Sequence, residues 1–279
     1  SMSAAVRVDA DADRLRGGND ASGEEFTEVV IFGDSQAHGT PHNDAGRYST
    51  PWPRLLEERA ESEFGLRVIS CSLPSRTTRW DDAGFGNQDW APRMKPSWFN
   101  GRSVLLPTLL QHSPNVLVVA LGTNDLHRDV QRYHVEERIA HGGSARALTP
   151  EEMATAVATS CVTLALEAAG VFPHLEENNV VLLTPPRLYV TAESASWGFN
   201  KTSEAIAAVL PAAFSAVCRA NGLICAHPAA VDMRESADGV HYTEAHGVAV
   251  ADAVFAAIAK AKKGRKRARA ALFPGMMRY

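Results

Sequence analysis

Four residues of the chain have the types that nucleophilic catalysis needs: Ser35, Asn124, Asp238 and His241. A serine hydroxyl is a poor nucleophile unless a neutral imidazole takes its proton, and the oxyanion formed by its attack needs preorganised donors. Asp238 comes three residues before His241, so its carboxylate can hold one imidazole nitrogen while the other faces a pocket. Taken alone, the same pair also fits a surface loop before a capped helix, and the choice depends on its place in the fold.

Ser35 follows an apolar, β-branched run, residues 29–32, that ends at Gly33. Such runs are typical of buried strands in parallel sheets, whose ligands bind just beyond the carboxyl ends of the strands. Gly33 lets the backbone turn sharply and present Ser35 to a crevice. The alternative is an ordinary turn in which Asp34 and Ser35 cap a helix.

Asn124 has the same kind of position. A strand-like run, residues 115–121, ends in Gly122-Thr123-Asn124-Asp125, and His241 lies in the loop after the last predicted strand. Because alternating strands and helices bring all such loops to one edge of a parallel sheet, we expect these residues to lie close together. The sequence therefore predicts one site that combines them with Ser35.

Strands and helices alternate from residue 28 onward, which predicts one α/β domain around a five-stranded parallel sheet. The predicted strands are 29–33, 66–71, 115–121, 180–184 and 222–226. The predicted helices are 51–64, 104–111, 149–170, 203–220 and 244–262, and Pro211 should kink or break the fourth of them. We expect a flexible arm at 1–27, the domain at 28–262 and a basic tail at 263–279.

The composition argues against several classes of protein. A chain of 279 residues, 45% of them apolar, can bury a large core, and its net charge of −4 gives no reason to expect the body of the protein to bind nucleic acid. No apolar run is long enough for a membrane span, and the N-terminus lacks the order of a signal peptide. We predict a cytoplasmic protein, and the basic run at 260–269 leaves nuclear targeting open.

We predict no disulfide, no metal and no other cofactor. The four cysteines have no C-x-x-C spacing, and three lie in apolar runs, which indicates buried, reduced thiols. His127, His134 and His141 are spaced by seven residues, which is two helical turns or about 10 Å. Neighbours at that separation are too far apart to share one ion.

Three of these segments together resemble a known family. Gly33-Asp34-Ser35, Gly122-Thr123-Asn124-Asp125 and Asp238-Gly239-Val240-His241 are similar, in order and in position, to the blocks of the SGNH hydrolases, or GDSL-type esterases and lipases. The resemblance extends from residue 29 to about 260. Residues 73–78 and Asp81-Asp82 resemble the second block of the arylesterase and acyltransferase branch.

The resemblance implies a flavodoxin-like three-layer α/β/α sandwich and an enzyme that cleaves carboxylic esters. It implies that Ser35 is the nucleophile, that His241 is first general base and then general acid, and that Asp238 orients His241. The oxyanion hole would combine the side-chain amide of Asn124 with the backbone N–H groups of Ser35 and Ser75. Many family members have glycine where this chain has Ser75, but serine keeps the backbone donor.

Two irregular segments, residues 80–99 and the loop before the helix at 203–220, are rich in aromatic side chains. Such segments pack on the protein itself, line a pocket or form an oligomer interface. The tryptophans look bulky enough to close a pocket, so we predict a preference for acetyl to butyryl esters, with acyl transfer to alcohols left open. The predicted substrate-binding residues are Asp34, Trp80, Trp197 and Phe199.

Two other classes of protein stay open. In the first, Asp34, Asn124, His241 and His246 are scattered ligands of a metal-dependent phosphoesterase, but the clusters of acids and histidines that two metals need are missing. The second is a non-catalytic interaction protein, or a homo-oligomer, that uses the aromatic segment or the basic run. The chain has a candidate for every catalytic role, which favours the enzyme, with a small-molecule ester as its partner.

Overall fold

Parallel strands form the centre of the computed structural model, which describes residues 28–41, 46–80, 95–112, 114–172, 175, 179–229 and 231–272. The strands are β1 (Glu28–Gly33), β2 (Arg67–Ser72), β3 (Val116–Ala120), β4 (Val180–Leu183) and β5 (Ile224–Ala226). They form one sheet in the order β2-β1-β3-β4-β5, and every neighbouring pair is parallel. The predicted five-stranded parallel sheet is therefore confirmed.

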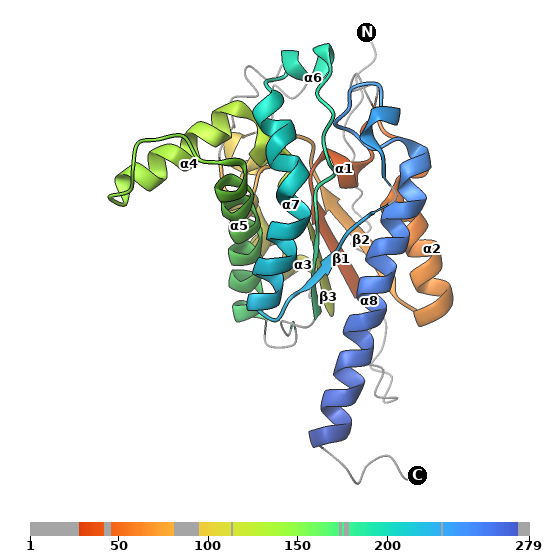
Figure 1. The fold of residues 1–279 in the computed structure, drawn as a ribbon. Coiled ribbons are helices and arrows are strands. Elements are labelled where there is room, and N and C mark those ends of the chain that lie inside the picture. Colours follow the sequence, from red (N-terminus) through yellow and green to blue (C-terminus); the bar gives the residue numbers. More distant parts are fainter. Residues whose placement is uncertain are drawn as a thin grey trace, which may run out of the picture.

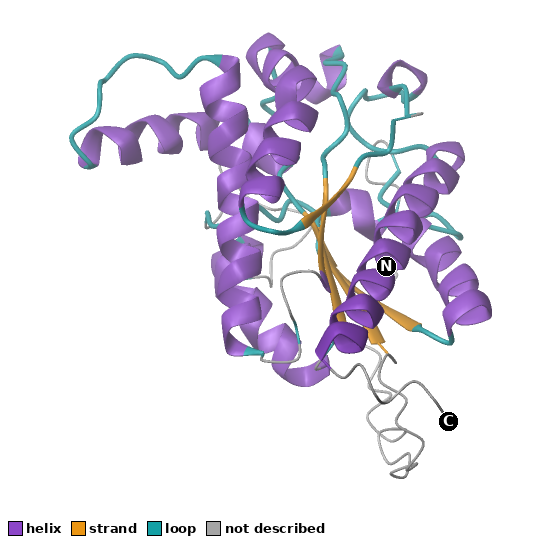
Figure 2. Ribbon diagram, turned by 60° about the horizontal axis from the view of Figure 1, so that its bottom comes forward, coloured by secondary structure: helices purple, strands orange, loops and turns teal. Residues whose placement is uncertain are grey.

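Helices cover both faces of the sheet (Figures 1 and 2). Side chains alternate along β1, so that Val30 and Phe32 join a core cluster with α3 (Gly101–His112), α5 (Pro150–Val171) and α7 (Lys201–Ala220). Val29 and Ile31 join the opposite cluster with α2 (Trp52–Phe64) and α8 (Glu244–Leu272). β1, β3 and β4 are buried on both faces, which explains their almost continuous apolar sequence. The two helical layers on either side of the sheet confirm the three-layer α/β/α sandwich.

The register of the sheet brings three strand ends together. Gly33 at the end of β1 pairs with Ser72 of β2 on one side and with Ala120 of β3 on the other. The segments that follow these strands therefore begin at one edge of the sheet. They carry Ser35, Ser75 and Asn124.

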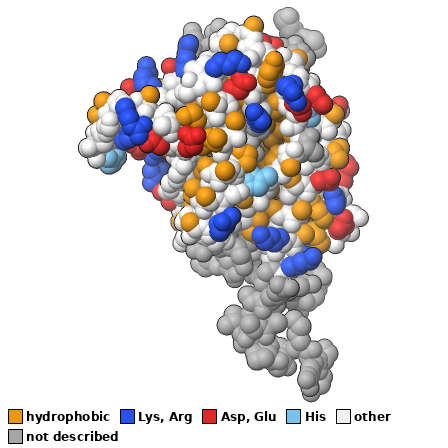
Figure 3. Space-filling view, viewed as in Figure 1, with side chains coloured by type: hydrophobic (Ala, Val, Ile, Leu, Met, Phe, Trp, Pro, Cys, Tyr) orange, Lys and Arg blue, Asp and Glu red, His pale blue; other side chains and the backbone are white. Residues whose placement is uncertain are grey.

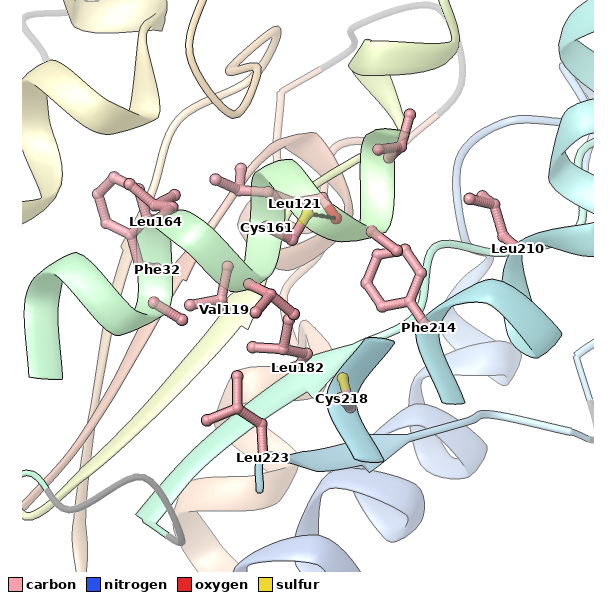
Figure 4. Packing of buried hydrophobic residues seen from close by; sticks show 14 of the residues in the cluster. Phe32, Val119, Leu121, Cys161, Leu164, Leu182, Leu210, Phe214, Cys218 and Leu223 are labelled. Carbon is pink, nitrogen blue, oxygen red and sulfur yellow. Dashed lines mark hydrogen bonds between the residues drawn. The ribbon is translucent and has the colours of Figure 1, made fainter. Parts of the chain in front are cut away.

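Two helices differ from the prediction. α7 begins at Lys201 and continues through Pro211 without a break. Its buried residues Ile206, Leu210 and Phe214 form one apolar stripe on both sides of the proline, and packing of this stripe against α5 and the sheet outweighs the one lost hydrogen bond (Figure 4). α8 continues to Leu272, ten residues beyond its predicted end at 262.

A further helix, α4 (Arg128–Ala140), was not predicted, because its segment is polar and lacks a long apolar stripe. Only Val130 and His134 of this helix are buried. α4 projects from the body of the protein (Figure 1), and basic and acidic side chains gather on this arm (Figure 3). The His127 side chain caps its first turn by accepting a hydrogen bond from the Asp129 N–H.

α5 and α7 are long and apolar enough, by length and composition alone, to cross a membrane. In the structure they pack against each other and against the sheet, and core helices of globular proteins pass the same test. The predicted absence of a membrane span stays a prediction.

Candidate active site

Ser35 is the first residue of the short helix α1 (Ser35–His38), directly after β1. Asp34 caps this helix, because its Oδ1 accepts a hydrogen bond from the Gln36 N–H at 2.9 Å. A side chain on Gly33 would lie 2.5 Å from the Ala37 β-carbon, so the sharp turn from strand to helix needs a glycine. The turn presents the Ser35 hydroxyl to His241, whose Nε2 lies 3.0 Å from Oγ.

His241 is held on its other side by Asp238. The distance from His241 Nδ1 to Asp238 Oδ2 is 2.9 Å. Asp238 Oδ1 accepts hydrogen bonds from the backbone N–H groups of Val240 and His241 at 2.7 and 2.8 Å, and from the Ser236 hydroxyl at 3.2 Å. Burial raises the pKa of Asp238, but the hydrogen bonds, above all the one from His241, hold it below its ordinary value. Asp238 therefore stays ionised at neutral pH.

Gly239 makes this turn possible. Its φ is +69°, and a β-carbon at this position would lie 1.6 Å from the carbonyl oxygen of Tyr189. No other residue type fits so close to that backbone. The Tyr189 N–H in turn donates to the Gly239 carbonyl at 2.9 Å, which fixes the loop against the segment after β4.

The segment after β2 forms a tight turn in which the Arg76 N–H donates to the Leu73 carbonyl at 3.3 Å. Ser75 has a φ of +63°, a left-handed conformation that favours glycine, and it is the one such residue other than glycine in the described part of the chain. Glycine adopts this conformation without strain, which is a physical reason for the glycine that the resemblance implies at this position. No described residue accepts a hydrogen bond from the Ser75 N–H or the Ser35 N–H.

Asn124 lies in the 3-10 helix η4 (Asn124–Leu126), after β3. Its Nδ2 donates to the Arg76 carbonyl at 3.0 Å, which connects it to the residue after Ser75. An amide nitrogen has two N–H donors, so this bond leaves the second for another acceptor. The Leu73 N–H donates to the Gly33 carbonyl at 3.1 Å, and these contacts connect the turns that carry Ser35, Ser75 and Asn124.

Two residues of the site were not predicted from the sequence. Arg76 is buried, stacks 4.3 Å from the ring centre of Phe32, and donates to the carbonyls of Gly33 and Cys71 at 3.1 and 2.7 Å. Burial lowers the pKa of Arg76 to about 10, so it remains a cation at neutral pH. It joins the ends of β1 and β2 to the turn of Ser75. A basic residue between two hydroxyls gave no sign of this role in the sequence.

Gln36 is the second missed residue. Its side-chain Nε2 donates to the Val240 carbonyl at 2.5 Å, and its Oε1 accepts from the Tyr242 N–H at 3.0 Å. These two bonds flank His241 in the chain. Gln36 directly follows Ser35, so one buried side chain ties the helix of the nucleophile to the loop of the base.

The predicted substrate-binding residues have different environments. Trp197 lies beside the site, with its ring centre 5.6 Å from that of His241. Trp80 instead packs on α4, 5.2 Å from the Tyr133 ring centre, and Phe199 is only 3% exposed and lies in the core. Asp34 is fully buried, and burial raises its pKa to about 7. Of the four, only Trp197 is placed to contact a substrate near Ser35.

The histidines spaced by seven residues have separate structural contacts. His127 Nε2 lies 2.6 Å from the Trp197 carbonyl oxygen, and a β-carbon on Gly198 would lie 2.0 Å from that nitrogen. His127 therefore supports the turn that carries Trp197. His134 packs edge-on against Trp80. The described residues contain no group of three or more side chains that could hold a metal ion.

The chain matches a known protein family over most of its length. A family model described as "GDSL-like Lipase/Acylhydrolase family" matches residues 31–247. No curated protein matches the chain.

Solved structures with a similar fold are known. One is a carbohydrate acetylesterase family member from Sinorhizobium meliloti, with 23% identity and a TM-score of 0.63 over 85% of this chain and 99% of that one. The native aryl esterase of M. smegmatis has 23% identity and a TM-score of 0.60 over 86% and 99%. A putative arylesterase from Agrobacterium tumefaciens str. C58 has 20% identity and a TM-score of 0.59 over 84% and 99%. At these identities the likeness shows the fold.

Proposed function

Because the chain belongs to the GDSL-like lipase/acylhydrolase family and is a carboxylic ester hydrolase, we propose that it cleaves short-chain, acetyl-like esters through an acyl-enzyme on Ser35. The observation that carries this proposal is the contact of Ser35 Oγ with His241 Nε2 at 3.0 Å, with Asp238 2.9 Å from the other ring nitrogen. A hydroxyl, a base and an orienting acid in this order are the arrangement that activates a serine.

In the first half of the reaction, Ser35 Oγ attacks the ester carbonyl and His241 Nε2 takes the hydroxyl proton. The ionised Asp238 keeps the Nδ1–H directed toward itself, so that Nε2 is free to accept, and it stabilises the imidazolium. The oxyanion accepts from the free N–H of Asn124 and from the backbone N–H groups of Ser35 and Ser75. His241 then returns the proton to the leaving alcohol, and the acyl group stays on Ser35.

In the second half, His241 takes a proton from a water molecule, which attacks the acyl-enzyme. His241 then gives this proton to Ser35 Oγ as the bond between Oγ and the acyl carbon breaks, and the carboxylic acid is released. An alcohol that takes the place of the water gives a new ester, which is the acyl-transfer reaction that the sequence left open. Hydrolysis and acyl transfer use the same side chains. Which of the two reactions occurs depends on whether water or an alcohol reaches the acyl group on Ser35.

The preference for short acyl groups rests on Trp197. Its ring lies beside His241, where a bulky indole limits the room for a long acyl chain. One solved structure of similar fold is described as a carbohydrate acetylesterase family member, which agrees with a small acyl group. The cytoplasmic location and a homo-oligomer stay predictions.

A panel of nitrophenyl esters of rising acyl length, measured with and without a chelator, tests the proposal. We expect the highest kcat/KM with acetyl to butyryl esters and the same rates with chelator. Faster turnover of long-chain esters would contradict the size argument. Loss of activity in chelator would instead favour a metal-dependent hydrolase.

A further inference from the structure

A second polar cluster lies at the edge of the sheet, between β4, β5 and α7. Cys225 of β5 pairs with Leu182 of β4, and the next residues outward on the same face are Thr184 and His227. The Thr184 N–H donates to the Ala226 carbonyl at 3.0 Å, which fixes the two strand ends side by side. α7 covers this face and contributes Ser215 and Cys218. None of these residues belongs to the site around Ser35.

The side chains form a chain of contacts. Cys225 Sγ lies 3.4 Å from Thr184 Oγ1, and Thr184 Oγ1 lies 2.8 Å from His227 Nδ1. His227 Nε2 lies 2.8 Å from Ser215 Oγ. Cys225 Sγ is also 4.0 Å from His227 Nδ1. A thiol, an imidazole and two hydroxyls are thus connected in one line.

The protons of these four side chains can be arranged so that Cys225 is a thiolate. Thr184 has one hydroxyl proton, so it can donate to Cys225 when it accepts from the His227 Nδ1–H. The Ser215 hydroxyl can either donate to His227 Nε2 or accept from it, so the ring can carry one proton or two. When it carries two, both N–H groups have oxygen acceptors, and Cys225 can be a thiolate stabilised by the Thr184 hydroxyl and a nearby positive charge.

The four thiols of the chain have different surroundings. Burial raises the pKa of Cys71 to about 11 and also raises that of Cys161. At Cys225, a hydrogen bond from the Cys218 thiol, with further bonds from His227 and Thr184, outweighs burial and lowers the pKa below that of an ordinary thiol. Cys225 is therefore the thiol most readily ionised at neutral pH.

The exposures of Cys225 and of the second thiol in this region, Cys218, differ. Cys225 lies on the edge strand and is partly exposed, whereas Cys218 is only 1% exposed. A cavity of about 690 Å³ borders the cluster at Thr184 and His227, which are part of its wall. Cys218 lies among the buried side chains on the inner side of α7 (Figure 4). Cys225 packs against the same buried cluster, where its thiol and the Cys218 thiol are hydrogen-bond partners. Both cysteines are free thiols in the structure.

We propose that Cys225 is a modification site for hydroperoxides and that Cys218 is the thiol that resolves its oxidised form. The Cys225 thiolate attacks one peroxide oxygen, the O–O bond breaks, and protonation of the other oxygen releases an alcohol or water, leaving a sulfenic acid on Cys225. The Cys218 sulfur then attacks the Cys225 sulfur, and the sulfenic hydroxyl leaves as water with the Cys218 proton. Two thiols are oxidised to a disulfide while one peroxide is reduced. This reaction is independent of ester cleavage.

Peptide mapping after hydrogen peroxide treatment tests the proposal. Arg219 lies between the two cysteines, and trypsin places each of the four cysteines in a separate peptide. We expect peroxide to join the Cys218 and Cys225 peptides and to leave Cys71 and Cys161 open to later alkylation. In Cys218→Ala, Cys225 should stop at the sulfenic acid, which dimedone traps. Oxidation of Cys71 or Cys161 before Cys225, or no joined peptide in the wild type, would overturn the proposal.

Two variants test the relay itself. His227→Ala and Thr184→Val should each slow the loss of the Cys225 thiol by about tenfold or more, because they remove groups that stabilise the thiolate. Cys71→Ala is the matched control and should leave the rate unchanged. Circular dichroism shows which variants are folded, and only these are compared. Unchanged rates in both folded relay variants would contradict the role of His227 and Thr184.

Discussion

Gln36 holds the loop of His241 from both sides, because its side-chain amide donates to the Val240 carbonyl and accepts from the Tyr242 N–H. The residue that follows the nucleophile thus fixes the backbone of the base. The distance between Ser35 Oγ and His241 Nε2 depends on this contact, since the two residues are 206 positions apart in the chain.

Gln36→Leu should therefore lower kcat more than it raises KM. The variant removes both hydrogen bonds, and a shift of the base by about 1 Å costs up to about 100-fold in rate. Steady-state kinetics with nitrophenyl acetate measure the effect. Gln36→Glu keeps the acceptor for the Tyr242 N–H and should lose less activity. Equal kcat values in Gln36→Leu and the wild type would show that the loop holds its position without Gln36.

The proposed oxyanion hole has a side-chain donor, the amide of Asn124, and a backbone donor, the N–H of Ser75, and substitutions should affect the two differently. Asn124→Ala removes a preorganised donor and should lower kcat by about 10² to 10³, or roughly 3 to 4 kcal/mol. Ser75→Gly keeps the backbone donor and suits the φ of +63°, so it should change kcat by less than about tenfold and leave the protein equally or more stable. A large loss in Ser75→Gly with a small loss in Asn124→Ala would assign the donor role to the Ser75 hydroxyl instead.

Trp197 is expected to set the length of the acyl group. Trp197→Ala should raise the ratio of kcat/KM for hexanoyl over acetyl esters by about tenfold. The reason is that one methylene more or less in an apolar pocket changes kcat/KM by about 10- to 200-fold. Trp80→Ala is the matched control, because Trp80 packs on Tyr133 and His134 of α4. A larger change in Trp80→Ala would place the acyl group near α4.

Asp34 makes stability depend on pH. Burial raises its pKa to about 7, so between its ordinary value and pH 7 the folded protein holds a proton that the unfolded chain has lost. The stability from this group is present at low pH and is lost as pH rises toward 7. Asp34→Asn should raise the Tm at pH 8 by several degrees, at about 2 to 4 °C per kcal/mol, and by much less at pH 4.5.

Thermal unfolding at the two pH values measures this effect. Asp252→Asn, on the exposed side of α8, controls for the loss of one negative charge. If Asp34→Asn changed the Tm equally at both pH values, the Asp34 carboxyl would not be protonated in the folded protein.

The sequence was sufficient for the part of the site that depends on strand ends. Gly33, Gly122 and Gly239 mark turns next to Ser35, Asn124 and His241, and a parallel sheet brings these turns to one edge. The sequence was insufficient where a side chain forms a hydrogen bond with a residue far away along the chain. Gln36 and Val240 are 204 positions apart, and Arg76 and Gly33 are 43 apart, so no local pattern reveals either bond.

The environments of aromatic side chains could not be predicted from the sequence either. Trp197 and Phe199 are two positions apart in one loop, yet Trp197 lies beside His241 and Phe199 lies in the core. The turn at Gly198 separates them, and its φ of +104° is a feature of the folded backbone. α7 gives a further case, because Pro211 predicted a kink or a break, and the packing of Leu210 and Phe214 keeps the helix unbroken.

The most direct test of the central claim is the turnover of nitrophenyl acetate by Ser35→Ala, His241→Ala and the double variant. If Ser35 and His241 act as one unit, each single change should lower kcat by at least ~10⁴-fold, and the double variant should be little worse than either. Losses that add, or a folded Ser35→Ala variant that retains activity, would contradict an acyl-enzyme on Ser35.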